Sequence, residues 1–168
     1  MITKERFAQS MARDCDMIVH LFSKLPAGSY DYRPSPEQRS TLELLRYLAV
    51  CGIAGITAMA AGDFKLFGPF SERVKDMAAE EFPAAMERQK QEILAFFDSV
   101  SEETLLTQEA PVPGGVQMPL GAALLVGPAK WLAAYKMQLF LYAKASGATE
   151  LKTANLWRGS DPAPPKAG

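Results

Sequence analysis

Apolar positions recur about every 3.6 residues along four long stretches of the chain. These stretches cover residues 4–24, 40–62, 82–100 and 120–146, and each carries its apolar side chains on one side of a helical wheel. Alternating patterns typical of strands are nearly absent, and only "PVPGGVQMP" is compatible with a short extended loop. Four helices with apolar stripes predict an all-α protein built as a four-helix bundle.

Residues that commonly begin or end helices stand at the ends of these stretches. Pro26 stops the first helix, and Ser40 with Glu43 three residues later has the pattern of a capping box at the start of the second. Pro83 falls in the first turn of the third helix, where proline is tolerated, and Gly147 follows the fourth as a C-cap.

The connections between the predicted helices are longer than in a minimal bundle. They span roughly residues 26–39, 62–79 and 101–119, so at least one is expected to cross over or to cover an end of the bundle. Residues 1–158 are expected to form one domain. The remaining 159–168, rich in Pro, Gly and Ala, are expected to be disordered.

Composition restricts the class of protein. The formal net charge of the 168 residues is -1, which argues against nucleic acid as a partner. The first residues are charged and lack the apolar core of a signal peptide, and the most apolar run is too short for a membrane span. Cys15 and Cys51 fall inside apolar helical patterns without CxxC spacing. We therefore expect a soluble, cytoplasmic protein with reduced cysteines and no membrane partner.

The order of motifs resembles the DinB/YfiT-like superfamily of metal-binding four-helix bundles. The resemblance covers nearly the whole chain, although its motifs are short. They are the Arg33–Pro34 pair before the second helix, the "STLELL" that opens it at residues 40–45, and Gln138–Leu139 with Tyr142 ahead of Gly147.

In that family three histidines typically bind a divalent metal, and the resemblance places them at Tyr47, Trp131 and Tyr135. None of these is a histidine, and the only histidine, His20, falls on the polar side of the first helix, where we expect it to be a solvated surface residue. Indole has no lone pair for a metal, and a phenol would have to ionise first. We therefore expect no metal and no cofactor, with aromatic side chains filling the volume of the family site.

Other polar residues also fall among apolar positions. Asp14 lies inside the apolar side of the first helix, with Tyr47 and Tyr135 as candidate hydrogen-bond donors, or else at the edge of the bundle bonded to a nearby side chain. Gln89 and Gln138 point toward the inner stripes. One reading is a small-molecule pocket; the other is a set of satisfied polar groups in the core. The candidate residues are Asp14, Tyr47, Gln89, Trp131, Tyr135, Gln138 and Tyr142.

The fourth helix is apolar on nearly all sides, so something must cover its outer face. One candidate is a second subunit packed around Met137 and Phe140, since family members are often homodimers. The other is the C-terminal segment folded back through Leu151, Leu156 and Trp157.

No phosphate-binding loop and no Ser/His/Asp arrangement is present. The sequence therefore favours a non-catalytic or small-molecule-binding DinB-like protein without the family's metal site. The alternatives are a metal-independent transferase acting on a small thiol or electrophile, and a protein-interaction module that uses the outer face of the fourth helix. An open pocket around Tyr47, Trp131 and Tyr135 would favour the transferase.

Overall fold

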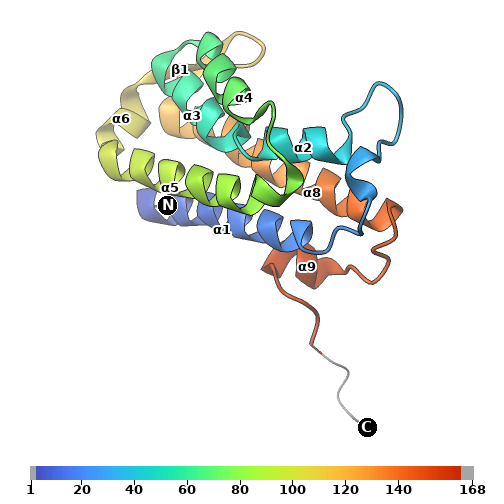
Figure 1. The fold of residues 1–168 in the computed structure, drawn as a ribbon. Helices are drawn as coiled ribbons and strands as arrows, with labels where there is room; N and C mark the ends of the chain where they lie inside the picture. The colour runs from blue at the N-terminus through green and yellow to red at the C-terminus, as the bar shows by residue number, and fades with distance from the viewer. Residues whose placement is uncertain (1–2, 164–168) are drawn as a thin grey trace.

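The computed structural model describes residues 3–163, which form a bundle of helices with one short β-hairpin (Figure 1). The predicted all-α, four-helix-bundle fold is confirmed. In chain order, the elements are α1 (Lys4–Phe22), η1 (Ser29–Asp31), α2 (Thr41–Leu48), α3 (Cys51–Ala61), η2 (Phe64–Leu66), α4 (Phe67–Val74), η3 (Ala79–Glu81), α5 (Phe82–Ser99), α6 (Glu102–Thr107), β1 (Glu109–Val112), β2 (Val116–Pro119), α7 (Leu120–Leu124), η4 (Leu125–Ala129), α8 (Lys130–Ala145) and α9 (Thr153–Arg158).

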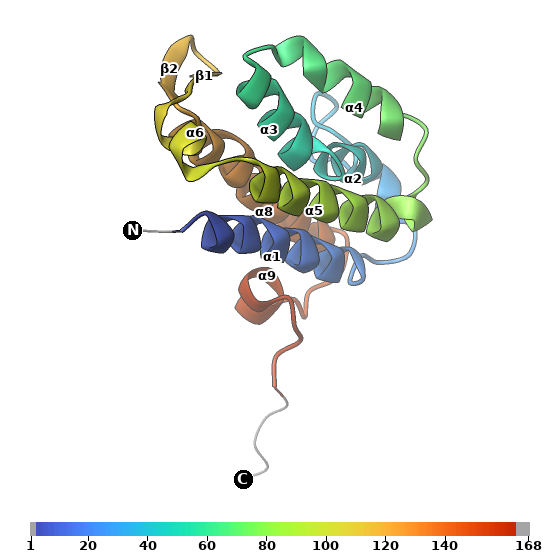
Figure 2. The same cartoon turned by 90° about the vertical axis from the view of Figure 1, so that its left-hand side faces the viewer.

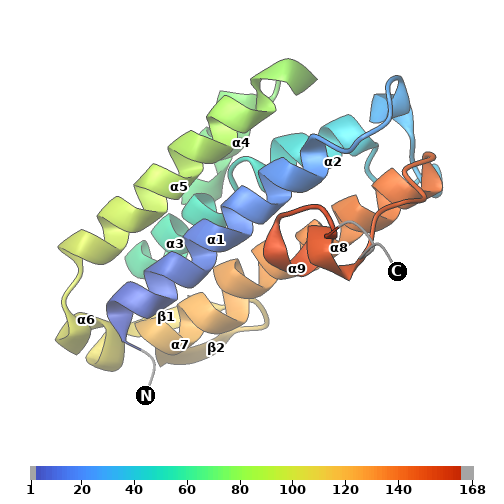
Figure 3. The ribbon, with the colours of Figure 1, turned by 90° about the horizontal axis from the view of Figure 1, so that it is seen from below.

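Four helical rods make the bundle: α1, α2 with α3, α5, and α7 with α8. The first rod, α1, packs against α5 and α8, and α3 packs against the same two helices (Figures 2 and 3). The rods thus stand at the corners of a square with α1 diagonally opposite α3. Large apolar side chains fill the space between them, among them Ile18, Leu21, Leu44, Leu48, Ile56, Phe82, Met86 and Phe97.

The second predicted helix, residues 40–62, is in fact two helices. Val50 leaves the helical conformation, with φ -137° and ψ -18°, and α2 and α3 meet at a 46° bend. Apolar residues continue through the bend in both helices, so the sequence pattern does not reveal it. Within the described part of the chain no single helix is long and apolar enough to cross a membrane; only this bent pair, taken together, has the length and composition.

The fourth predicted helix is continuous, but a π-helical turn, η4, joins α7 to α8. Pro128 lies in this turn and has no N–H to donate, which favours opening of the α-helical ladder. The neighbouring Gly127 allows α3 to approach closely, because a Cβ there would lie 2.4 Å from Cε of Met59.

The connections contain more regular structure than the sequence predicts. Residues 62–79 include η2 and α4, and α4 packs back over α2 and α3 (Figure 1). Residues 101–119 include α6 and an antiparallel hairpin in which Val112 pairs with Val116. The hairpin turn holds two glycines, Gly114 and Gly115, with φ of 98° and 81°, a region that favours glycine.

The C-terminal segment folds back onto the bundle, where α9 packs against α1 and α8 (Figure 3). Leu156 is buried there, and Leu151 packs with Ala143 and Ala148. Residues 159–168 were expected to be disordered, which stays a prediction. In the described part of this tail, Asp161 accepts hydrogen bonds from Lys24 and Asn155, at 2.7 and 3.0 Å. Residues 164–168 of that prediction lie outside the described part.

Candidate functional site

Four aromatic side chains meet where the resemblance places the family's metal ligands. The ring centroids of Tyr47 on α2 and Tyr135 on α8 are 4.7 Å apart in an edge-to-face arrangement. Phe67 of α4 lies 6.3 Å from the ring of Tyr47 and 6.3 Å from that of Trp131. We call Tyr47, Phe67, Trp131 and Tyr135 the aromatic cluster.

The local sequence explains how these rings come together. Trp131 and Tyr135 are one helical turn apart on α8 and therefore project from the same side. Gly55 on α3 leaves room for the indole, because a Cβ at Gly55 would lie 2.5 Å from Cζ3 of Trp131. Phe67 was not predicted as part of the site, since its segment reads as a connection and carries no family motif.

A guanidinium covers the outer side of the cluster. The Cζ atom of Arg39 lies 4.4 Å from the ring centroid of Tyr47 and 5.7 Å from that of Tyr135, within the range of cation–π interaction. Arg39 is exposed, while the two phenol rings beneath it are half-buried. This contact was not predictable from the sequence pattern, because Arg39 lies in the loop before α2.

Tyr142 and Gln138 hold the Arg39 segment in place. The Tyr142 hydroxyl donates to the Arg39 carbonyl at 3.0 Å and accepts from Nε2 of Gln138 at 2.7 Å. The ring of Tyr142 also packs edge-to-face on Tyr32, at 5.4 Å. These two candidate residues therefore flank the aromatic cluster and position its covering arginine.

The residues of the cluster do not fit a divalent metal. Burial, followed by the nearby Cys51 and Tyr135, raises the pKa of the Tyr47 phenol well above its ordinary value. The phenol is then neutral at physiological pH, and tryptophan supplies no lone pair at all. Within residues 3–163, no group of three or more His, Cys, Asp and Glu side chains is arranged to hold a metal ion.

Asp14 lies elsewhere, and of its two expected placements the structure has the one at the edge of the bundle, bonded to a nearby side chain and not to Tyr47 or Tyr135. Its carboxylate accepts a hydrogen bond from Nζ of Lys136 on α8. Lys136 is itself buried, with its ammonium 4.6 Å from the ring centroid of Trp157. Asp14 faces the side of α8 that carries Lys136 and Phe140, whereas Tyr135 points toward α2.

Gln89 also stands apart from the aromatic cluster. Its Nε2 donates to the Leu48 carbonyl and its Oε1 accepts from the Gly52 N–H, both at 2.8 Å. A longer contact of 3.3 Å joins the same oxygen to the N–H of Ile53. Gln89 thus forms hydrogen bonds with the backbone groups that lose their helical partners at the break between α2 and α3.

The expectation of a solvated His20 is wrong, because α9 covers its ring. Nδ2 of Asn155 lies 3.1 Å from Nε2 of His20, and the Asn155 Oδ1 accepts the N–H of Lys152. In that orientation the Asn155 amide can donate to Nε2 of His20, a contact that favours the neutral ring. Partial burial lowers the His20 pKa, and the opposing effect of Asp161 is smaller.

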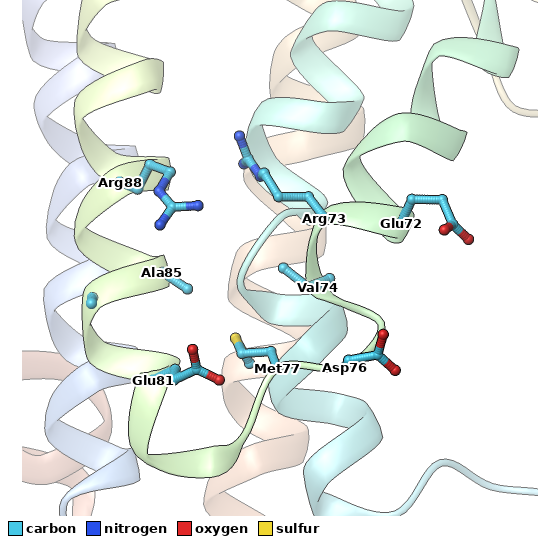
Figure 4. A pocket seen from close by; sticks show the side chains of 9 residues that line it. Glu72, Arg73, Val74, Asp76, Met77, Glu81, Ala85 and Arg88 are labelled. Atoms are coloured by element: carbon cyan, nitrogen blue, oxygen red, sulfur yellow. The ribbon is translucent and has the colours of Figure 1, made fainter.

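Two clefts open on other parts of the surface. One, of about 390 Å³, lies between α5 and the segment that links α4 to η3 (Figure 4). The other, of about 400 Å³, lies between the start of α1 and the α6–α7 region. No residue of the aromatic cluster lines either cleft.

No family model and no curated protein matches this sequence. Among solved structures, the fold is similar to that of a DinB-like protein, YjoA from Bacillus subtilis, with a TM-score of 0.65 and 18% sequence identity. The match covers 86% of this chain and 94% of the Bacillus protein. At this identity the likeness concerns the fold, which agrees with the motif resemblance. The chain therefore has the fold of a DinB-like protein.

Proposed function

We propose that this chain is a non-catalytic DinB-fold protein in which the aromatic cluster replaces the metal site as a structural centre. The observation that carries this proposal is the packing of Tyr47 on Tyr135 at 4.7 Å beneath the Arg39 guanidinium. The rings stand at the positions to which the resemblance assigns the metal ligands, and the guanidinium covers them.

The alternative of a metal-independent transferase finds little support in the placement of reactive groups. Asp14 is paired with Lys136, and Gln89 is bonded to the backbone of α2 and α3. Burial, and secondarily the charge of Asp14, raises the pKa of the Cys15 thiol to about 12. Burial also raises the Cys51 pKa, so neither thiol is a nucleophile near neutral pH.

The two free thiols also support location in a reducing compartment such as the cytoplasm.

Elemental analysis of the dialysed protein tests the proposal that the aromatic cluster replaces the metal site. We expect no stoichiometric zinc, nickel or iron in the parent, and near one ion per chain would overturn the proposal. The triple variant Tyr47→His/Trp131→His/Tyr135→His is expected to bind zinc more tightly than the parent. The single variant Tyr135→His is the matched control, because one imidazole gives no chelate.

A rate assay tests the absence of catalysis. Mixing the protein with 2-mercaptoethanol and 1-chloro-2,4-dinitrobenzene is expected to give the rate of the uncatalysed reaction. A saturable acceleration that is lost in Tyr47→Phe would favour the transferase instead.

The exposed apolar side of α7, η4 and α8 favours a second candidate function, self-association. Leu125 and Leu141 are 53% and 56% exposed, and Val126 lies between them along the same rod. The C-terminal segment covers the opposite side of α8, where Phe140 packs against Leu151, so the interface expected around Met137 and Phe140 is partly covered within the chain. We propose a homodimer through the uncovered side, since one self-complementary patch suffices to close a symmetric pair.

Light scattering of the double variant Val126→Lys/Leu141→Glu tests this interface. A dimeric parent is expected to become a folded monomer in the variant. Phe64→Glu, an exposed apolar residue on η2, is the control and is expected to leave the mass unchanged. A parent that is already monomeric at micromolar concentration would reject the dimer.

A further inference from the structure

In the cleft between α5 and the 72–77 segment, charged side chains project from the α5 side, and Val74 and Met77 lie opposite them among the charged residues of the segment (Figure 4). Glu81 ends η3 directly before α5, and Ala85 and Arg88 follow it on α5 at intervals of four and three residues, so the three side chains project from the same side. The short side chain of Ala85 leaves a hollow between the two charged ones.

Contacts with α2 and α5 hold the 72–77 segment in place. Nε of Arg46 on α2 donates to the Met77 carbonyl at 2.9 Å, which fixes this segment against the bundle. At one end of the cleft, the Arg73 guanidinium donates two hydrogen bonds to the Glu92 carboxylate of α5, at 2.6 and 3.0 Å. A cleft with walls fixed in this way loses little conformational freedom on binding.

The charges within the cleft have opposite signs and stand at opposite ends. Glu81 accepts the Ala78 N–H through one carboxylate oxygen at 2.7 Å, and its other oxygen has no hydrogen bond within residues 3–163. Arg88 extends from α5 into the hollow, and in the same residues it forms no ion pair with any carboxylate. Arg73 is already neutralised by Glu92. Glu72 and Asp76 also line the cleft, but their carboxylates turn away from α5 (Figure 4). The side of the cleft on α5 therefore presents the Glu81 carboxylate and the Arg88 guanidinium.

Their spacing sets the length of a complementary ligand. Two helical turns separate Glu81 from Arg88, which is about 10 Å along the axis. The Arg88 side chain turns toward the end of the hollow that holds Glu81 (Figure 4), so the gap between the charged groups is shorter than that. The termini of an extended dipeptide are about 7 Å apart, since each residue spans at most ~3.5 Å.

We propose that this cleft binds a short zwitterion of dipeptide size. The ligand's ammonium pairs with Glu81, its carboxylate pairs with Arg88, and an apolar side chain lies over Val74, Met77 and Ala85. The volume of about 390 Å³ lies in the range of small-molecule sites. The aromatic cluster does not line the cleft, so binding here does not depend on the role proposed for that cluster.

The test is a titration of the full chain with the dipeptide Ala-Leu, followed by amide chemical shifts in NMR. We expect saturable shifts concentrated in residues 72–88. N-acetyl-Ala-Leu lacks the ammonium and Ala-Leu amide lacks the carboxylate, so each is expected to bind about fivefold more weakly, as for one exposed ion pair.

Two variants assign the ends of the ligand. Arg88→Gln is expected to lower the affinity for Ala-Leu, so that Ala-Leu no longer binds more tightly than its C-terminal amide. Glu81→Gln can still accept the Ala78 N–H. In this variant Ala-Leu is expected to bind no more tightly than N-acetyl-Ala-Leu. Arg158→Gln on α9 is the control and should change neither affinity.

The zwitterion site is rejected if no saturable shifts occur up to about 10 mM, a range that includes weak ligands. Equal binding of the free and blocked dipeptides would also reject it, because the charges would then have no role. Shifts centred outside residues 72–88 would place the ligand elsewhere and overturn the assignment.

Discussion

Lys136 on α8 and Asp14 on α1 form a hydrogen-bonded ion pair at 2.5 Å, and 1% and 16% of their side chains are exposed. Met17 and the ring of Trp157 complete the surroundings of the ammonium. A buried ion pair adds little net stability over an apolar pair, but loss of one partner leaves a costly unpaired charge.

Asp14→Ala is therefore expected to lower the free energy of unfolding by about 3 to 5 kcal/mol, because Lys136 stays buried without a counter-charge. The double variant Asp14→Leu/Lys136→Met is expected to regain most of this loss. Urea denaturation measures both. Asp16→Ala removes the more exposed partner of Lys90 and serves as control, with an expected change below about 1 kcal/mol. Equal effects of Asp14→Ala and Asp16→Ala would contradict the burial of the first pair.

Gln89→Leu is expected to destabilise the protein by about 2 to 4 kcal/mol, since it leaves the Leu48 carbonyl and the Gly52 N–H buried without partners. The matched control is Gln91→Leu on the exposed side of α5, where we expect a change within about 0.5 kcal/mol. Denaturant melts with an unchanged m-value would show that the difference lies in stability. Similar losses in the two variants would mean that the bend between α2 and α3 does not rely on Gln89.

Trp131→Ala is expected to destabilise the bundle by about 3 kcal/mol, at the lower end of the cost for a large aromatic residue, because the indole is only half-buried. Gly55→Ala is expected to cost about 1 to 3 kcal/mol, since the new methyl group would overlap the indole. The double variant should lose less than the sum of the two, as removing the indole relieves that overlap. Strictly additive losses in thermal or chemical melts would show that the two residues do not interact.

The stability of the α9 docking is expected to fall as the pH drops from 7.5 to 5.5. The His20 pKa is lower in the folded chain than the ordinary value of about 6.5, so the unfolded state binds more protons in this window. The stabilisation is present above pH 6.5 and is lost as the pH falls through the folded pKa. Amide hydrogen exchange in α9 measures it, and His20→Gln is expected to reduce the pH dependence. An unchanged pH profile in this variant would assign the effect to other groups.

The positions of the four rods were predictable because each rod is long enough for its apolar period to stand out. The interruptions inside them were not. Val50 breaks a run in which both halves keep their apolar residues inward, and the stabilising Gln89 comes from a helix far along the chain.

For the aromatic cluster, the family motifs led to Tyr47, Trp131 and Tyr135, which the structure brings together. Phe67 and Arg39 were missed because both lie in segments that read as connections. Lys136 was missed as the partner of Asp14, although its position among apolar neighbours on α8 was the available signal. Pairings between distant helices depend on which faces meet, and periodicity alone does not determine that.

The α9 segment has a consequence for the order in which this protein completes its fold during synthesis. Asn155 and His20, which α9 brings together, are 135 residues apart, so the ribosome makes α1 long before the helix that covers it. N-terminal segments begin to fold first on the ribosome. Until α9 emerges, the nascent chain must leave one side of the α1–α8 groove open to chaperones, to proteases and to other nascent copies.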